Sequence, residues 1–284
     1  MKTKLDHIPE KGFFADMEDG RHDYYYDRKK MTGCTTVLSV ISKPALIAWS
    51  ANCAVDSARK GYLELLRGLS DRRIDTLDEY IVFETDKVLE ILEEARTAYA
   101  KKRDDAASKG TDVHAEIEWM IKESILNRDG LLSPSWLEGD ESEQYVHFYN
   151  WAIKNKVRFL ASEKPVYSKT LWVAGTYDFK CEIDGKVYLG DIKTSSGIYD
   201  RVPFAQCAAY QMMEEEMFGE PNEDSSHKHY LRPTGRLVIN LKKTGKFDEE
   251  KDVYFSYDYE QDLKIFKAAL DIYRFNKKMV VRQH

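Results

Sequence analysis

Two aspartates and a lysine fall in neighbouring segments whose residue pattern predicts β-strands. Asp178 lies in the predicted strand 173–183, and Asp191 and Lys193 lie in the predicted strand 186–194. The Asp-Gly pair between the two segments has the composition of a tight hairpin turn. Pairing the strands through that turn would bring Asp178 across from Asp191.

The second strand would bury a carboxylate and an ammonium on one face. Asp191 and Lys193 are two apart and point the same way as Val187 and Leu189, so the strand is expected to be central. Buried charges are costly unless they are paired or bind a metal. The two aspartates, with the backbone carbonyl of Ile192, offer hard oxygen ligands for Mg²⁺ or Mn²⁺. Such an ion polarises phosphates and activates water, and a lysine beside it would orient that water or stabilise the developing negative charge.

The first strand alternates along its whole length, which predicts two distinct faces. One face would carry Val173, Gly175, Tyr177, Phe179, Cys181 and Ile183, and the other Ala174, Thr176, Asp178, Lys180 and Glu182. Simpler interpretations exist for single residues, because Asp191 and Lys193 could form a structural ion pair and Asp178 could cap a turn. Their combination favours a metal-dependent catalytic site formed by all three.

Three segments follow one another in order: GTYD at 175–178, GDIKT at 190–194 and QCAAY at 206–210. Together they resemble the PD-(D/E)XK nuclease superfamily. More narrowly, they are similar to its RecB-type branch, which includes phage exonucleases, CRISPR adaptation nucleases and the mitochondrial genome maintenance exonuclease. The branch has a Gln-x-x-x-Tyr helix after the lysine strand. Gln206 and Tyr210 match it and would share one helix face.

The branch also places a histidine on an upstream helix, in a Gly-Thr-x-x-His setting. Residues 110–114 fit this setting, and Glu118 follows one helical turn after His114. The resemblance implies that His114 is a further metal ligand. Glu163, in the first strand of the sheet, matches a glutamate often seen in the branch. Glu118, Glu163 and Thr194 are therefore supporting candidates, as are Gln206 and Tyr210.

The chain also departs from the family pattern. Tyr177 stands where the superfamily name expects proline, although RecB-type members often lack it. Some relatives carry an iron–sulfur cluster bound by one upstream and three C-terminal cysteines. This chain has four cysteines and none after Cys207, so no iron–sulfur cluster is expected. Without a CxxC pair, we interpret all four as buried small apolar residues.

The elements that would position these residues follow from the hydrophobic pattern. Residues 1–33 look polar and irregular. Helices are predicted at 37–41, 45–66, 76–109, 112–125, 141–154, 202–218 and 259–277, with Gly110-Thr111 as a break, and strands at 157–168, 173–183, 186–194, 236–241 and 252–257. This order predicts an α/β (α+β) fold, with a restriction-endonuclease-like core whose mixed central sheet is flanked by helices. A helical N-terminal region, 1–155, would contribute His114 to a nuclease core at 156–284, the two forming one integrated domain.

Composition limits the cellular setting. No apolar run approaches the roughly 20 residues that span a bilayer, and no signal-peptide pattern occurs at the N-terminus, so a cytoplasmic protein of bacterial or phage origin without a membrane partner is expected. The net charge of −6 is opposite to the basic footprint usual for nucleic-acid binders. DNA contacts would therefore depend on local basic clusters, which are Arg28-Lys29-Lys30, Lys101-Lys102-Arg103 and Lys242, Lys243 and Lys246.

The leading functional hypothesis is a Mg²⁺- or Mn²⁺-dependent DNA exonuclease of the phage-like recombination or repair type, acting on single- or double-stranded ends. A recombination or single-strand annealing partner and a homo-oligomer fit the same setting. An endonuclease or flap nuclease of the same fold is the first alternative. A catalytically inactive nucleic-acid-binding module is the second, and another phosphoryl hydrolase is a distant third.

Overall fold

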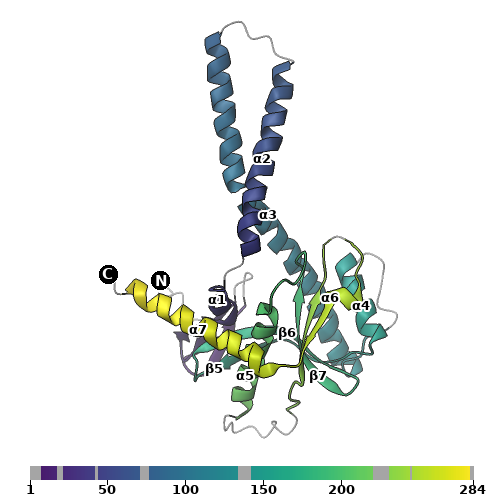
Figure 1. The fold of residues 1–284 in the computed structure, drawn as a ribbon. Coiled ribbons are helices and arrows are strands. Elements are labelled where there is room, and N and C mark those ends of the chain that lie inside the picture. Colours follow the sequence, from purple (N-terminus) through teal and green to yellow (C-terminus); the bar gives the residue numbers. More distant parts are fainter. Residues whose placement is uncertain are drawn as a thin grey trace. The chain divides into compact units, whose positions relative to one another are not determined.

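The computed structural model describes residues 8–17, 22–41, 44–70, 77–133, 142–219, 230–243 and 245–281. Helices and a mixed sheet make up these ranges (Figure 1), so the predicted α+β class is confirmed. By its contacts the chain divides into two compact units, a sheet unit (residues 1–41 and 112–284) and a helical unit (residues 42–111). Residue 155, the boundary expected from the sequence, lies inside the sheet unit.

Within the described residues, the sheet unit is built on a six-stranded mixed sheet with the order β4-β6-β7-β8-β9 and with β5 also paired to β6. Its strands are β4 (Thr32–Gly33), β5 (Arg158–Ser168), β6 (Val173–Ile183), β7 (Lys186–Lys193), β8 (Gly235–Asn240) and β9 (Val253–Ser256). β4 and β6 are parallel, as are β7 and β8, and the other pairs are antiparallel. The strands predicted after residue 156 are therefore confirmed within a residue or two at each end.

Helices cover both faces of this sheet (Figure 1). On one face, α4 and the part of α3 from Val113 onward form a core with Phe159, Phe179 and Leu237. On the other, α1, α5 and α7 form a core with Val166 and Leu189. The helices, with the short α6 before β9, are α1 (Cys34–Leu38), α3 (Leu77–Arg128), α4 (Glu143–Lys154), α5 (Val202–Gly219), α6 (Glu249–Asp252) and α7 (Tyr259–Val281).

Residues 8–17 and 22–33, the described part of the first 33, are not irregular, so that prediction was wrong for them. They contain β1 (Phe13–Asp16), β2 (Asp23–Tyr26) and β3 (Lys29–Lys30), which form a three-stranded antiparallel sheet. Aromatic side chains favour strands when one face can be buried. Here Tyr24 is buried and its hydroxyl lies 3.0 Å from Oγ1 of Thr176 on β6. Burial against a distant strand is a tertiary effect that the local polar pattern conceals.

The predicted break at Gly110-Thr111 was also wrong, because α3 is one continuous helix from Leu77 to Arg128. One helical glycine costs only about 1 kcal/mol relative to alanine, which the flanking helix-forming residues offset. In the helical unit, α2 (Pro44–Ser70) packs against the first part of α3. A Cβ at Gly61 would lie 2.9 Å from Cγ1 of Ile91, so this glycine permits their close approach.

Among the helices of the described ranges, none combines enough length with enough apolar character to cross a lipid bilayer.

Candidate metal centre

Glu163 of β5 and Asp178 of β6 lie between two paired positions, Ser162 with Phe179 and Lys164 with Tyr177. The backbone is irregular here, because Glu163 has a φ of +45°. One carboxylate oxygen of each residue lies within 4.8 Å of the other.

His114 from α3 completes a group of three potential metal ligands with these carboxylates. Its Nδ1 lies 3.7 Å from Oδ2 of Asp178. One donor atom from each of His114, Glu163 and Asp178 lies within 4.8 Å of the other two. Two ligands of one Mg²⁺ ion are at most about 4.2 Å apart, twice a metal–oxygen distance of about 2.1 Å, and ligands at adjacent octahedral positions are closer. The three donor atoms would therefore move closer together to bind one ion.

Asp178 also contacts β7 directly. Its Oδ2 accepts a hydrogen bond of 2.6 Å from the backbone N–H of Ile192. The β6–β7 ladder begins at the pair of Phe179 and Gly190. Just beyond that pair, the Asp178 side chain accepts from the Ile192 amide in place of a backbone carbonyl of β6. The sequence led us to expect the carbonyl of Ile192 at the site, whereas the amide of Ile192 makes this contact.

Asp191 is paired with Lys193. The lysine Nζ lies 2.8 Å from Oδ1 and 2.7 Å from Oδ2 of Asp191. Asp191 is buried on the α5 side of the sheet, beside Leu189 and Cys207, and it is outside the group of three donors. Burial raises the pKa of Asp191 even though the Lys193 ammonium opposes the rise. Burial alone would lower the pKa of Lys193, but Asp191 and Asp178 more than offset this and raise it.

Negative charge is concentrated around Glu163. Burial raises the pKa of Glu163 to about 8, and the charges of Asp178 and Glu118 add to the increase. Glu118 lies one turn after His114 on α3 and is half-buried, where it pairs with Lys122. A half-buried carboxyl whose anionic form is this unfavourable is the kind of group that a bound cation would stabilise. The residues present therefore fit a divalent metal.

The predicted faces of β6 are wrong from Phe179 onward. Tyr177 packs in the core that includes α5, whereas Phe179 packs in the core that includes α4, although a regular strand would place both on one face. Along this edge of β6, β4 pairs at Val173 and Ala174, and β7 pairs only from Phe179 onward. The irregularity therefore falls at Asp178, between the two neighbouring strands.

Gln206 and Tyr210 on α5 are joined, because Nε2 of Gln206 donates to the Tyr210 hydroxyl at 2.9 Å. The Tyr210 ring lies over Gly175, where an added Cβ would be 2.3 Å from its Cε1. A side chain at Gly175 of GTYD would therefore collide with the ring of Tyr210 of QCAAY. A Cβ at Gly190 would similarly lie 2.1 Å from Cζ of Phe179. Thr194, a further candidate, directly follows β7 and is half-buried.

Sequence reasoning missed Glu214 of α5. Its side chain is only 1% exposed and contacts Lys164 and Lys180. Lys180 is itself buried in β6, and a lysine in a buried strand requires an acidic partner. That requirement was readable from the sequence, but which acid meets it was not.

Comparison with protein-family models gives no match, and comparison with curated proteins gives none either. A fold class alone does not imply a function, so function must follow from the side chains of the site. These side chains combine three donors suited to one cation with a charged lysine held by a buried aspartate. That combination suits hydrolysis of a phosphate ester.

Proposed function

We propose that this protein is a Mg²⁺- or Mn²⁺-dependent deoxyribonuclease of the PD-(D/E)XK type, which hydrolyses phosphodiester bonds at DNA ends. The observation that carries the proposal is the convergence of donor atoms from His114, Glu163 and Asp178 within 4.8 Å. The Lys193–Asp191 pair on the adjacent strand β7 adds the positive charge that phosphoryl transfer needs. A role in recombination or repair, in a bacterium or a phage, is part of the same proposal.

His114, Glu163 and Asp178 would hold the ion. Two carboxylates suit Mg²⁺ and Mn²⁺, and the imidazole makes Mn²⁺ the better fit of the two. When bound, the ion would polarise a phosphate oxygen and lower the pKa of a water molecule. Glu163 must lose its proton to take part, because only the carboxylate form binds a cation well.

Lys193 would stabilise the negative charge that develops on the phosphate. Its raised pKa keeps it protonated at neutral pH, and its side chain is 30% exposed, so it is accessible to a substrate. Asp191 contacts the ammonium through both carboxylate oxygens and so fixes its position. In this proposal Asp191 acts mainly as a positioning residue for Lys193. This role differs from the metal-ligand role that the sequence predicted for Asp191.

Digestion of end-labelled linear, nicked and covalently closed circular DNA tests the proposal. Each substrate is incubated with Mg²⁺, Mn²⁺ or a chelator. We expect degradation of linear DNA from its ends, no cleavage of closed circles, and complete loss of activity with the chelator. Cleavage of closed circles would instead favour an endonuclease. DNA binding without metal binding, measured by calorimetry, would favour an inactive binding module.

Lys193→Met tests the site itself, and Lys242→Met is a matched control. Lys193 and Lys242 have side chains 30% and 29% exposed, and each pairs with an almost fully buried aspartate, Asp191 or Asp252. Only Lys193 belongs to the proposed site. If neither the wild-type protein nor the control cuts any of these DNA forms while folded, the proposal is wrong.

A further inference from the structure

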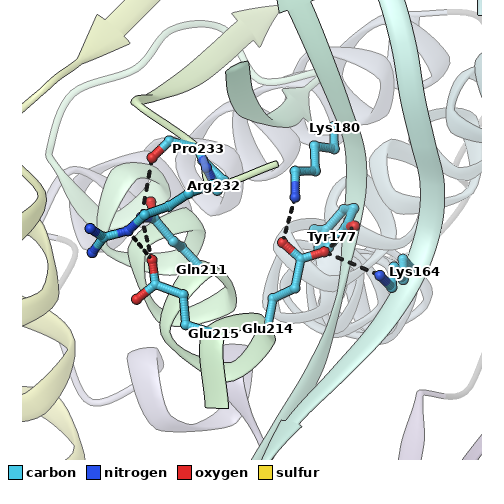
Figure 2. Close-up of polar contacts among 8 residues, drawn as sticks. All are labelled: Lys164, Tyr177, Lys180, Gln211, Glu214, Glu215, Arg232 and Pro233. Carbon is cyan, nitrogen blue, oxygen red and sulfur yellow. Dashed lines mark hydrogen bonds and ion pairs between the residues drawn. The ribbon is translucent and has the colours of Figure 1, made fainter. Parts of the chain in front are cut away.

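One buried carboxylate, Glu214, joins three side chains from β5 and β6 (Figure 2). The Tyr177 hydroxyl donates to its Oε1 at 3.0 Å, and Nζ of Lys164 donates to the same oxygen at 3.2 Å. Nζ of Lys180 donates to Oε2 at 2.9 Å. Glu214 comes from α5, so this helix is tied to two adjacent strands at one point.

Two of the three donors are sequence neighbours of the two carboxylate ligands. Lys164 follows Glu163, and Tyr177 precedes Asp178. Lys164 and Tyr177 are paired in the register, and both reach Glu214 of α5. Their neighbours Glu163 and Asp178 instead have carboxylate oxygens near His114 of α3. Neighbouring residues of the same two strands therefore form the Glu214 cluster and the metal centre.

The backbone at the metal centre is irregular on both strands. Glu163 has a φ of +45°, which is unusual for a residue other than glycine and is strained within a strand. On β6, the regular alternation of faces fails between Tyr177 and Phe179. Such conformations persist only where surrounding contacts fix them. The contacts of Glu214 lie next to both irregular positions.

The Glu214 carboxylate is paired with two positive charges. Two ammonium groups share one carboxylate, and each also lies over an aromatic ring. Nζ of Lys180 is 4.5 Å from the ring centre of Tyr230, and Nζ of Lys164 is 4.8 Å from that of Phe218. These cation–π contacts help to stabilise the second positive charge. The Glu214 carboxylate therefore has directional partners on both of its oxygens.

We infer that Glu214 is a positioning residue for the metal centre, holding β5 and β6 so that Glu163 and Asp178 present their carboxylates to one divalent ion. The inference rests on the proposed metal centre. Residues that orient metal ligands without touching the metal typically change metal affinity by about 10- to 100-fold when they are lost. Loss of the cluster should therefore appear first as weaker metal binding.

Lys164→Met is the most informative variant. It releases the β5 side of the cluster and leaves Glu214 paired with Lys180 and Tyr177, so no buried charge loses its last partner. We expect the dissociation constant for Mn²⁺, measured by calorimetry on the full chain without DNA, to rise about tenfold. Lys164→Arg, which can still reach Glu214, should restore most of the affinity. At saturating Mn²⁺, Lys164→Met should cut DNA with a kcat near the wild-type value.

Arg158→Met is the matched control. Arg158 pairs across the same two strands with Glu182 and is 35% exposed, like Lys164. This variant should bind Mn²⁺ as the wild type does. A second test variant, Glu214→Gln, keeps an acceptor for Tyr177 but loses the charge that holds both lysines, so its Mn²⁺ affinity should fall further.

The outcomes separate this inference from the proposed function. Wild-type affinity in Lys164→Met, with the wild type itself binding Mn²⁺, overturns only the role of Glu214. An equal loss of affinity in Arg158→Met also overturns it, because any weakening of the β5–β6 pair would then suffice. A folded wild type that binds neither Mn²⁺ nor Mg²⁺ overturns the metal centre and this inference together.

Discussion

The carboxylate of Asp178 and the backbone amide of Ile192 are joined by a 2.6 Å hydrogen bond. The same carboxylate oxygen lies 3.7 Å from Nδ1 of His114. One oxygen atom therefore has two neighbours, one from β7 and one from α3. Asp178 fixes the end of the β6–β7 pair and is also placed to bind a cation. Substitutions can separate these two roles.

We expect Asp178→Asn to lose metal binding while the fold remains stable. The asparagine carbonyl can still accept the hydrogen bond from Ile192, but the negative charge is gone. Asp178→Ala should lose both metal binding and the hydrogen bond. The Ile192 amide is then unpaired, which costs about 1–3 kcal/mol of stability. Calorimetry with Mn²⁺ and urea unfolding distinguish the two variants. Wild-type Mn²⁺ affinity in Asp178→Asn would show that this carboxylate is not a ligand.

Glu163 should make the stability of the metal-free protein depend on pH. Burial raises its pKa from 4.5 to about 8 in the folded chain, so between these values the folded state holds a proton that the unfolded state has released. The free energy of unfolding should therefore decrease as pH rises from about 4.5 to about 8. Glu163→Gln should remove this part of the slope. Urea unfolding across this pH range, in the presence of a chelator, measures both.

Metal binding should show the opposite trend with pH. Since the cation requires the carboxylate form of Glu163, affinity for Mn²⁺ should increase over the same range, and binding should release protons. Calorimetry in buffers of different ionisation enthalpy counts the protons released. If affinity does not change between pH 6 and pH 8, Glu163 does not take part in binding.

The steric contact between Gly175 and Tyr210 leads to a prediction about stability. Gly175→Ala places a Cβ 2.3 Å from the tyrosine ring, which overpacks a buried position and should cost about 1–3 kcal/mol or more. Gly33→Ala is the control on the neighbouring strand β4, because its Cβ would meet Thr36 at an ordinary 3.4 Å. Thermal unfolding of Gly175→Ala and Gly33→Ala measures their difference in stability. Adding Tyr210→Ala to Gly175→Ala should be less harmful than the sum of the single changes.

Local pattern was sufficient to predict much of the sheet unit. The bounds of β6 were predicted correctly because alternation and the turn after it are encoded in adjacent residues. The hairpin was predicted to bring Asp178 across from Asp191, but the observed ladder stops one pair short, at Phe179 and Gly190, and Asp178 instead accepts from the Ile192 amide. Tyr210 was named as a supporting site residue through a family resemblance, and that role stays a prediction; its contact with Gly175 is a separate steric finding.

The convergence of Glu163 with Asp178 was not derivable in the same way. It depends on the β5–β6 register, which shifts between Phe159 and Ala161, and on the positive φ of Glu163. A register shift of one residue moves every later side chain to the other face. The partner of Lys180 was hidden for a similar reason, since Glu214 is distant in sequence and meets it only through helix packing on the sheet.

The last prediction concerns Lys193, whose loss should affect activity and stability in different ways. Lys193→Met should lower kcat by about 10²- to 10³-fold, the usual cost of removing one group that stabilises transition-state charge. At saturating DNA, Lys242→Met should keep the wild-type kcat, because Lys242 belongs to a candidate DNA-contacting cluster and not to the proposed catalytic site. Both variants leave a buried aspartate without its lysine, which costs up to about 3–5 kcal/mol when the charge remains.

The stability of Lys193→Met should also depend on pH. The pKa of Asp191 is already raised by burial and should rise further without the ammonium. The folded variant would then hold a proton that the unfolded chain has lost, so its stability deficit relative to wild type should shrink as pH falls. Urea unfolding at several pH values measures this deficit. A constant deficit with retained activity would mean that Lys193 and Asp191 form an ordinary structural ion pair.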